Sequence, residues 1–180
     1  MRSLSVVLVL CWPALLAGPV EKMYGLFGEL RSGKPMSFQL SEAEINDYLK
    51  QSLVITPRPG VKSVTLKVFP QNYVSTFAVV DFDAIERWKP GTVPVLLRPV
   101  LSGTRSIWVD ARFKAEAGLA SFSIEKAYFQ KIPLPAFAVE KMIQVVAARQ
   151  PEHYDTGKPL PIPFGLKRVW TEGNTIRGVK

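Results

Sequence analysis

The sequence predicts one α+β domain built on an antiparallel sheet. Three pairs of alternating segments are joined by short turns, as in β-hairpins, and two segments carry apolar residues at helical spacing. The chain has 180 residues, of which 47% are hydrophobic and 21% are charged, which is typical of an ordered domain with its own core. We therefore expect a single domain over residues 18–180.

The N-terminal segment has the layout of a secretory signal peptide. Arg2 supplies a positive start, an apolar run covers Leu4–Cys11, and small residues follow up to Gly18. We expect cleavage after Ala17, and therefore export to the periplasm or cell envelope. An uncleaved membrane anchor and a buried first strand or helix are the alternatives. Removal of residues 1–17 takes away the only cysteine, which excludes disulfides and cysteine catalysis.

The first predicted helix begins at a capping box. Ser41 is followed three residues later by Glu44, so that each side chain can accept a hydrogen bond from a free backbone N–H. Leu40 and Ile45 bracket this start as a hydrophobic staple. The helix then carries one apolar face, formed by Ile45, Tyr48, Leu49 and Leu53. Prolines and a glycine in Thr56–Gly60 end it.

A first hairpin is predicted around the turn Pro70–Tyr73. On its first strand Val64, Leu66 and Val68 alternate with polar residues. The return strand, Val74–Phe82, is apolar on both faces, so we expect it to be covered on both sides.

A second, longer hairpin turns at Ala115–Gly118. Its first strand has one apolar face, Ile107, Val109, Ala111 and Phe113, and Trp108 and Asp110 lie on the opposite face. Strict alternation on the second strand predicts that one face carries Ala120, Phe122, Ile124, Lys126 and Tyr128.

The long helix is predicted over Lys131–Pro151, with Pro135 in the first turn, where its missing N–H would be unpaired anyway. Its broad apolar face consists of Phe137, Ala138, Met142, Val145 and Val146. After a proline-rich loop the chain ends in a last hairpin, Leu166–Trp170 with Thr175–Val179.

The motifs of common catalytic and cofactor sites are missing from the sequence. His153 is the only histidine and lies in a loop rich in proline and glycine, where a solvated side chain is the ordinary interpretation. No His, Cys or carboxylate cluster has metal-ligand spacing, and no glycine-rich phosphate loop occurs. We therefore expect no enzyme activity, no metal and no cofactor. The alternative is an enzyme acting on lipids or glycans through Asp81 and Asp83, whose spacing puts both carboxylates on one side of a strand.

The charge of the chain predicts an anionic partner. Without Arg2 it has 22 basic and 15 acidic residues, a net charge of +7. An exported basic protein meets anionic lipid head groups or acidic glycans before nucleic acid. The pairs Arg87–Trp88 and Arg168–Trp170 are scattered rather than arranged as a stripe. We expect a monomer that contacts an anionic membrane surface and binds no nucleic acid.

The segment Val93–Leu101, VPVLLRPVL, is unusually apolar for a connection between two hairpins. Pro94 and Pro99 disfavour a core strand, and Pro99 also disfavours a regular helix. Because exposed apolar patches mark partners, ligand grooves or membranes, we expect this segment to form the lip of a groove or to touch a bilayer, with Arg98 reaching a phosphate. The alternative is a plug over the end of the core.

The order of these motifs resembles exported bacterial lipid-binding proteins of the LmeA-like phospholipid-binding family and the YpmS-like envelope proteins. The resemblance extends over Phe38–Val179, although the segment 93–101 does not align. The matching residues are Leu40, Ser41, Glu44, Ile45 and Asn46 at the helix start, Leu134 and Pro135 before the long helix, and Leu160, Pro161, Gly165, Val169, Gly173 and Ile176 in the closing hairpin.

The resemblance implies a strongly curved antiparallel sheet wrapping one long helix, with an elongated apolar groove and non-enzymatic binding or transfer of a phospholipid or other amphiphile. Removing apolar surface from water is favourable by about 25 cal/mol per Å², so one acyl chain supplies enough driving force. We expect acyl chains to contact Tyr48, Leu49, Phe77, Val79, Val95, Leu96, Leu97, Phe122, Ile124, Phe137, Met142 and Val146. Head-group candidates are Arg98, Arg105 and Lys131. The alternative is an envelope interaction or scaffold module with a filled core and no ligand.

Overall fold

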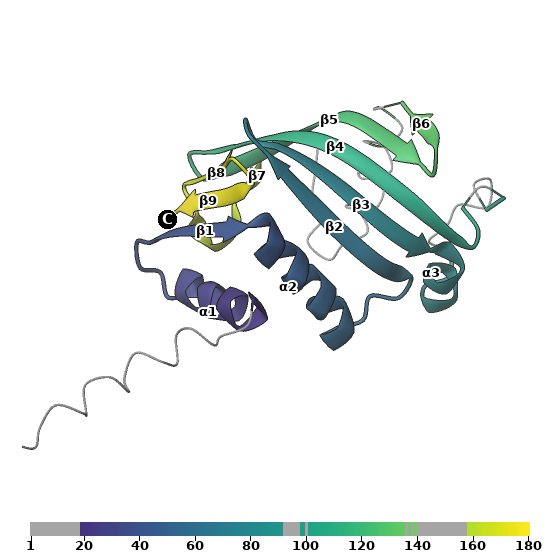
Figure 1. The fold of residues 1–180 in the computed structure, drawn as a ribbon, viewed down its shortest axis with the longest axis horizontal. Coiled ribbons are helices and arrows are strands. Elements are labelled where there is room, and N and C mark those ends of the chain that lie inside the picture. The colour runs from purple at the N-terminus through teal and green to yellow at the C-terminus, as the bar shows by residue number, and fades with distance from the viewer. Residues whose placement is uncertain (1–18, 92–97, 100, 136, 138, 140–157) are drawn as a thin grey trace, which may run out of the picture.

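One antiparallel sheet of nine strands and three α-helices form the part of the chain that the computed structural model describes (Figure 1). This part comprises residues 19–91, 98, 99, 101–135, 137, 139 and 158–180. The strand order is β1-β9-β8-β4-β3-β2, and β5 pairs with β4, β6 and β7. The α+β class and the antiparallel sheet expected from the sequence are thereby confirmed.

The elements have the following bounds. The helices are α1 (Pro19–Arg31), α2 (Glu42–Ile55) and α3 (Phe82–Trp88), with a short 3-10 turn at Pro163–Gly165. The strands are β1 (Ser37–Ser41), β2 (Val61–Phe69), β3 (Tyr73–Asp81), β4 (Thr104–Glu116), β5 (Leu119–Phe129), β6 (Ile132–Leu134), β7 (Leu160–Pro161), β8 (Arg168–Glu172) and β9 (Thr175–Val179).

The three expected hairpins are confirmed. β2 and β3 meet at a turn in which Gln71 and Asn72 have φ angles of 61° and 58°, and β4 and β5 meet at Ala117 and Gly118, with φ angles of 51° and 77°. Positive φ at both central residues gives the turn twist that matches paired strands. β8 and β9 form the closing hairpin.

The predicted capping box is present at the start of α2. The backbone N–H of Glu44 donates to Ser41 Oγ at 3.2 Å, and the backbone N–H of Ser41 donates to Glu44 Oε2 at 2.8 Å. The side-chain hydrogen bond from Lys22 is the largest cause of the lowered pKa of Glu44, and the hydrogen bond from the Ser41 backbone adds to it. This network links the start of α2 to α1.

α2 lies along the outer edge of β2 (Figure 1). The Asn46 amide donates to Leu66 O at 2.8 Å and accepts from Leu66 N at 2.7 Å. Glu42 Oε2 accepts from Val68 N at 2.9 Å. Backbone groups that would otherwise face an open edge are therefore paired with helix side chains, which blocks pairing with another chain.

α1 is an element that sequence reasoning missed. Its apolar positions Met23, Leu26, Phe27 and Leu30 recur at helical spacing, and this is the signal that could have predicted it. Met23 and Leu30 are buried, and Leu30 joins a core cluster with strand residues. Packing of α1 against α2 thus covers one end of the sheet.

α3 corrects the expected end of the return strand. Asp81 is the N-cap of α3, since its carboxylate accepts from the Ala84 N–H at 2.9 Å, and Asp83 is in the first helical turn. The prediction that Asp81 and Asp83 lie on one side of a strand is therefore wrong. The hydrogen bond from Ala84 is also the main cause of the lowered pKa of Asp81.

A β-bulge corrects the expected faces of β5. Asp110 pairs with Lys126, but its neighbour Ala111 pairs with Ile124, so that Glu125 is an extra residue on β5. Ile124 therefore faces the same side as Ala111, whereas Lys126 faces the side of Asp110. The prediction of one shared face from Ala120 to Tyr128 is wrong, because a bulge shifts the alternation by one residue.

The predicted long helix falls largely outside the described residues. Within Lys131–Pro151, the first residues form β6 instead, which pairs with β5. Phe137 and Val139 are helical, and Val139 is buried. Among the described residues, no helix combines the length and apolarity needed to cross a membrane.

Among the described residues, many of the buried apolar side chains form two clusters, which lie at opposite ends of the sheet. The first, beside α1, contains Leu30, Phe113, Ala115, Ile162 and Leu166. The second, beside α3, contains Val80, Phe82 and Phe129. On the sheet between them Ala127 is buried opposite Val109, whereas several neighbouring apolar side chains are only half-buried.

Candidate binding faces of the sheet

The strand register divides the side chains of the central strands between two faces, because directly paired residues point to the same side. The face that we call the apolar face carries Val64, Leu66, Thr76, Ala78, Ile107, Val109, Ala111 and Ile124. The opposite face, which we call the aromatic face, carries Thr65, Lys67, Ser75, Phe77, Trp108, Asp110, Lys126 and Tyr128.

The middle of the apolar face belongs to neither core cluster. Six half-buried residues form this region, which we call the apolar floor: Val64, Leu66, Thr76, Val109, Ala111 and Ile124. Only Thr76 in this set has a polar side-chain atom. The apolar floor therefore suits contact with hydrocarbon and offers almost nothing for recognition of charge or hydrogen-bonding groups.

The structure distributes the expected acyl-chain residues over several places. Ile124 lies on the apolar floor, and Phe122 lies on the apolar face opposite Phe113, with 64% of its surface exposed. Phe77 and Val79 lie on the aromatic face, paired with Trp108 and Ser106. Phe77 is 41% exposed, so the prediction that this strand is covered on both sides is wrong at this position.

Other residues of that set lie away from the central strands. Tyr48 packs its ring edge-on against Tyr24 and Phe27 of α1, with centroids 6.1 and 5.7 Å apart. Leu49 is half-buried on α2, and Phe137 is 73% exposed. Five of the expected residues lie outside the described residues, namely Val95, Leu96, Leu97, Met142 and Val146.

The three head-group candidates gather at the end of the sheet that holds α3. Arg98 pairs with Glu86 of α3 at 2.6 Å. Arg105 is at the start of β4, opposite Val80 on the apolar face, and Lys131 is exposed in the turn between β5 and β6. Sequence reasoning grouped these cations, and the topology brings them to one end.

A buried carboxylate anchors the centre of the aromatic face. Asp110 and Ser75 are buried, and the Trp108 indole N–H donates to both, at 2.7 Å to Asp110 Oδ1 and 2.5 Å to Ser75 Oγ. Burial raises the pKa of Asp110, but hydrogen bonds from Ser75, Trp108 and Tyr73 outweigh it, so the pKa is lowered. Burial is also the main cause of the raised pKa of Tyr73, and Asp110 adds to it. Asp110 is therefore an ionised acceptor that holds Trp108 in place.

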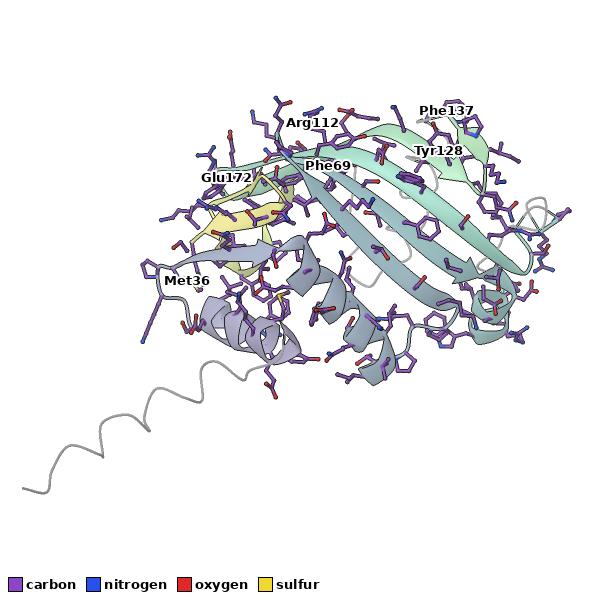
Figure 2. All side chains as sticks on the ribbon, viewed as in Figure 1. Met36, Phe69, Arg112, Tyr128, Phe137 and Glu172 are labelled. Atoms are coloured by element: carbon purple, nitrogen blue, oxygen red, sulfur yellow. The ribbon has the colours of Figure 1, made fainter. Side chains whose placement is uncertain are left out.

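Sequence reasoning missed the alignment of aromatic residues on this face. Phe77 pairs with Trp108, and Trp108 with Tyr128, whose ring centroid lies 6.4 Å from that of Trp108. Figure 2 labels Tyr128, which belongs to this alignment, and also Phe69 and Arg112, which both pair with Tyr73 further along the sheet. Alternation already assigned Trp108 to the polar side of its strand, but the register between β3 and β4 follows a long connection and could not be predicted.

Metal-ligating side chains do not cluster in the described part of the chain, where no group of three or more His, Cys, Asp or Glu could hold an ion. Comparisons of the chain with protein-family models, curated proteins and solved structures give no match. The two faces of the sheet are therefore the features of this protein that bear on its function.

Proposed function

We propose that this protein binds a phospholipid or another amphiphile without covalent chemistry, with the acyl chains on the apolar floor. The observation that supports this proposal is the half-buried apolar region between the two core clusters formed by the described residues. A sheet whose core was simply filled would be expected to bury these side chains in one continuous cluster. An acyl chain is long, narrow and apolar. The apolar floor is likewise apolar and extends across several neighbouring strands.

We further propose that the long helix predicted from the sequence lies opposite the apolar floor and forms the second wall of the binding site. We expect the sheet to curve around the helix predicted from the sequence, so that an elongated groove forms between them. Met142 and Val146 would contribute to that wall. This part of the proposal follows from the resemblance to LmeA-like and YpmS-like lipid-binding proteins and concerns residues outside the described part of the chain.

The head group belongs at the end of the sheet near α3 in this proposal. Arg105 and Lys131 lie there, together with Arg98. A lipid phosphate at this end would be close to cations, while its acyl chains extend along the apolar floor. The same cations suit contact with an anionic membrane surface, as expected for a basic protein exported to the bacterial envelope as a monomer.

Native mass spectrometry of protein purified from its own envelope tests the proposal, with organic extraction to identify what is released. We expect stoichiometric lipid on the wild-type protein. Protein that is free of lipid under gentle conditions would contradict the proposal and favour an interaction module with a filled core.

Two neighbouring substitutions on β5 locate the lipid. Ile124→Asp puts a charge on the apolar floor, whereas Ser123→Asp puts the same charge on the opposite face, paired with Arg112. We expect loss of bound lipid only for Ile124→Asp, because burying an unpaired carboxylate against hydrocarbon is unfavourable. Melting temperatures control for folding, and Ile124→Ser replaces the aspartate if that variant is unstable. Equal lipid content in both variants would exclude the apolar floor as the site.

A further inference from the structure

The aromatic face carries one continuous row of side chains that crosses five strands. The register aligns them in the order Thr65 on β2, Phe77 on β3, Trp108 on β4, Tyr128 on β5 and Pro133 on β6. Neighbouring strands are about 4.8 Å apart, so the row is about 19 Å long and one side chain wide. We call it the aromatic row.

Two of the three rings in the aromatic row are exposed to solvent, and the third, that of Tyr128, is half-buried. Phe77 is 41% and Trp108 is 47% exposed. None of the three described helices lies over the middle of β3, β4 and β5 (Figure 1). Exposed aromatic residues in register on adjacent strands are a contiguous patch rather than isolated surface residues, and such patches mark a binding surface.

Trp108 is held in one orientation. Its N–H is bonded to Ser75 and Asp110, and both acceptors belong to the next row along the sheet. The indole therefore leans along the sheet toward that row, with 47% of its surface exposed and its plane inclined by 57° to the ring of Tyr128. A ring fixed in this way loses little conformational entropy when a ligand stacks on it.

Polar side chains of both hydrogen-bonding types flank the aromatic row. One neighbouring row contains Lys67, Ser75, Asp110 and Lys126, and the other contains Ser63, Val79 and Ser106. Further along, Arg112 is neutralised by Glu125, whose carboxylate lies 2.8 Å from the guanidinium Nε. Exposed amino groups of Lys67 and Lys126 and the hydroxyl groups of Ser63 and Ser106 thus lie beside the rings, while the carboxylates of buried Asp110 and of Glu125 offset most of the positive charge.

We propose that the aromatic row binds a linear polysaccharide with uncharged pyranose rings. A pyranose ring presents C–H groups on its face, which pack on aromatic rings, and hydroxyl groups at its rim, which need both donors and acceptors. The aromatic row offers rings along its length and both kinds of hydrogen-bonding group at its sides. This site is on the opposite face from the apolar floor, so it does not depend on the lipid proposal.

The balance of charge favours a neutral glycan over a polyanion. Single-stranded nucleic acid also stacks on aromatic rings, but it is bound in strongly positive grooves. Here Asp110 stands beside Trp108, and Glu125 pairs with Arg112. A bilayer surface fits less well, because the row is narrow and its two neighbouring rows carry lysine, serine and aspartate, with Val79 as their one apolar residue.

Titration calorimetry of the full-length protein tests this inference with hexasaccharides of β-1,4-linked glucose, β-1,4-linked N-acetylglucosamine and α-1,4-linked glucose. We expect at least one of them to bind. Phe77→Ala and Trp108→Ala should each weaken that binding about tenfold, since each removes one stacking ring. Phe122→Ala is the matched control, because it removes an exposed ring from the opposite face. Phe77→Ala keeps the Asp110 cluster intact and so remains informative if Trp108→Ala unfolds.

Three outcomes would overturn the inference. The first is the absence of binding to all three hexasaccharides at millimolar concentration. The second is equal loss of binding in Phe77→Ala and Phe122→Ala. The third is binding of oligothymidylate or anionic vesicles that is tighter than glycan binding and is lost in Phe77→Ala, which would assign the row to a nucleic acid or to a membrane. Lipid content should be unchanged in Phe77→Ala. The absence of glycan binding would therefore not contradict the lipid proposal, which the Ile124 and Ser123 variants test.

Discussion

At the residue scale, Asp110 is a buried carboxylate on the aromatic face of the sheet, where it lies beside the buried Ser75. Its hydrogen bonds lower its pKa, which makes it a source of stability that depends on ionisation. A carboxyl group with a lowered pKa in the folded state contributes stability above its unfolded pKa, and this contribution is lost as the pH falls through the folded value.

Replacing this carboxylate tests that role. We expect Asp110→Asn to lower the free energy of unfolding at pH 7 by about 1–3 kcal/mol, the cost of impaired buried hydrogen bonds. The difference from wild type should begin to shrink below about pH 4, where the carboxyl of the unfolded chain takes up a proton, and should be lost only below the lower pKa of the folded state. Urea unfolding at pH 7 and pH 3 measures both values. Glu125→Gln is the control, since its exposed pair with Arg112 is worth little. An equal deficit at both pH values would show that ionisation is irrelevant.

Gly60 is the second residue with a specific requirement. It joins α2 to β2 with a φ of +83°, and a Cβ here would lie 2.6 Å from the backbone oxygen of Asp81 and would also meet the Ile85 side chain. Gly173 has a φ of +59° but open space around it. The positive φ disfavours a side chain at both positions. At Gly60 a side chain would in addition overlap with neighbouring atoms.

Alanine at these two glycines separates backbone strain from steric overlap. We expect Gly173→Ala to cost about 1 kcal/mol, which is the left-handed penalty alone. Gly60→Ala should cost clearly more, because the backbone of Asp81 must move. Melting temperatures of the two variants compare them directly. Equal shifts would mean that the close approach to Asp81 relaxes freely.

At the element scale, α2 stabilises the sheet chiefly through polar side chains. None of its residues is buried, yet Asn46 and Glu42 bond to the edge of β2. An edge strand with unpaired backbone groups is a template for association with other chains. The helix therefore serves as a cover for the edge.

Removing the amide of Asn46 tests edge protection. We expect Asn46→Ala to destabilise the fold by about 1–2 kcal/mol, because Leu66 N–H and C=O lose their partner. The variant should also self-associate, which analytical ultracentrifugation detects. The neighbouring exposed residue gives the control Asp47→Ala. A variant that is less stable but strictly monomeric would show that the helix stabilises the edge without protecting it.

At the scale of the whole molecule, the two ends of the sheet differ in what they can bind. The end near α3 gathers Arg98, Arg105 and Lys131, together with the exposed side chains of Trp88 and Ile132. Cations beside apolar side chains are typical of surfaces that contact anionic bilayers. If this end contacts the membrane, removing a positive charge there should weaken membrane binding more than removing one elsewhere.

Charge reversal at opposite ends measures this difference. We expect Lys131→Glu to weaken binding to vesicles containing anionic phospholipid, since each cation near the surface contributes about 1 kcal/mol. Lys114→Glu, near the other end of β4, should have a smaller effect. Cosedimentation with vesicles at low and high salt checks both variants, and binding should weaken as salt screens the charges. Equal effects would indicate a general charge attraction without an oriented contact.

Local chemistry allowed much of the fold to be predicted. The capping box of α2 and the turns at Asn72 and Gly118 each depend on residues a few positions apart, so their consequences are visible in the sequence. Alternation on β2 and β4 likewise assigned the apolar and polar faces of those strands. By contrast, alternation predicted the wrong faces for part of β5, because the bulge at Glu125 arises from the pairing of β5 with β4.

The sequence by itself determined the α+β class, the three hairpins and the cap of α2, because these follow from backbone preferences and from side-chain periodicity within short segments. Only the tertiary structure decided that Trp108 lies between Phe77 and Tyr128, and that two clusters of buried side chains form at opposite ends of the described sheet. The physical reason is that strands joined by the long connection 82–103 choose their register by packing against one another. The two candidate binding faces are products of that choice.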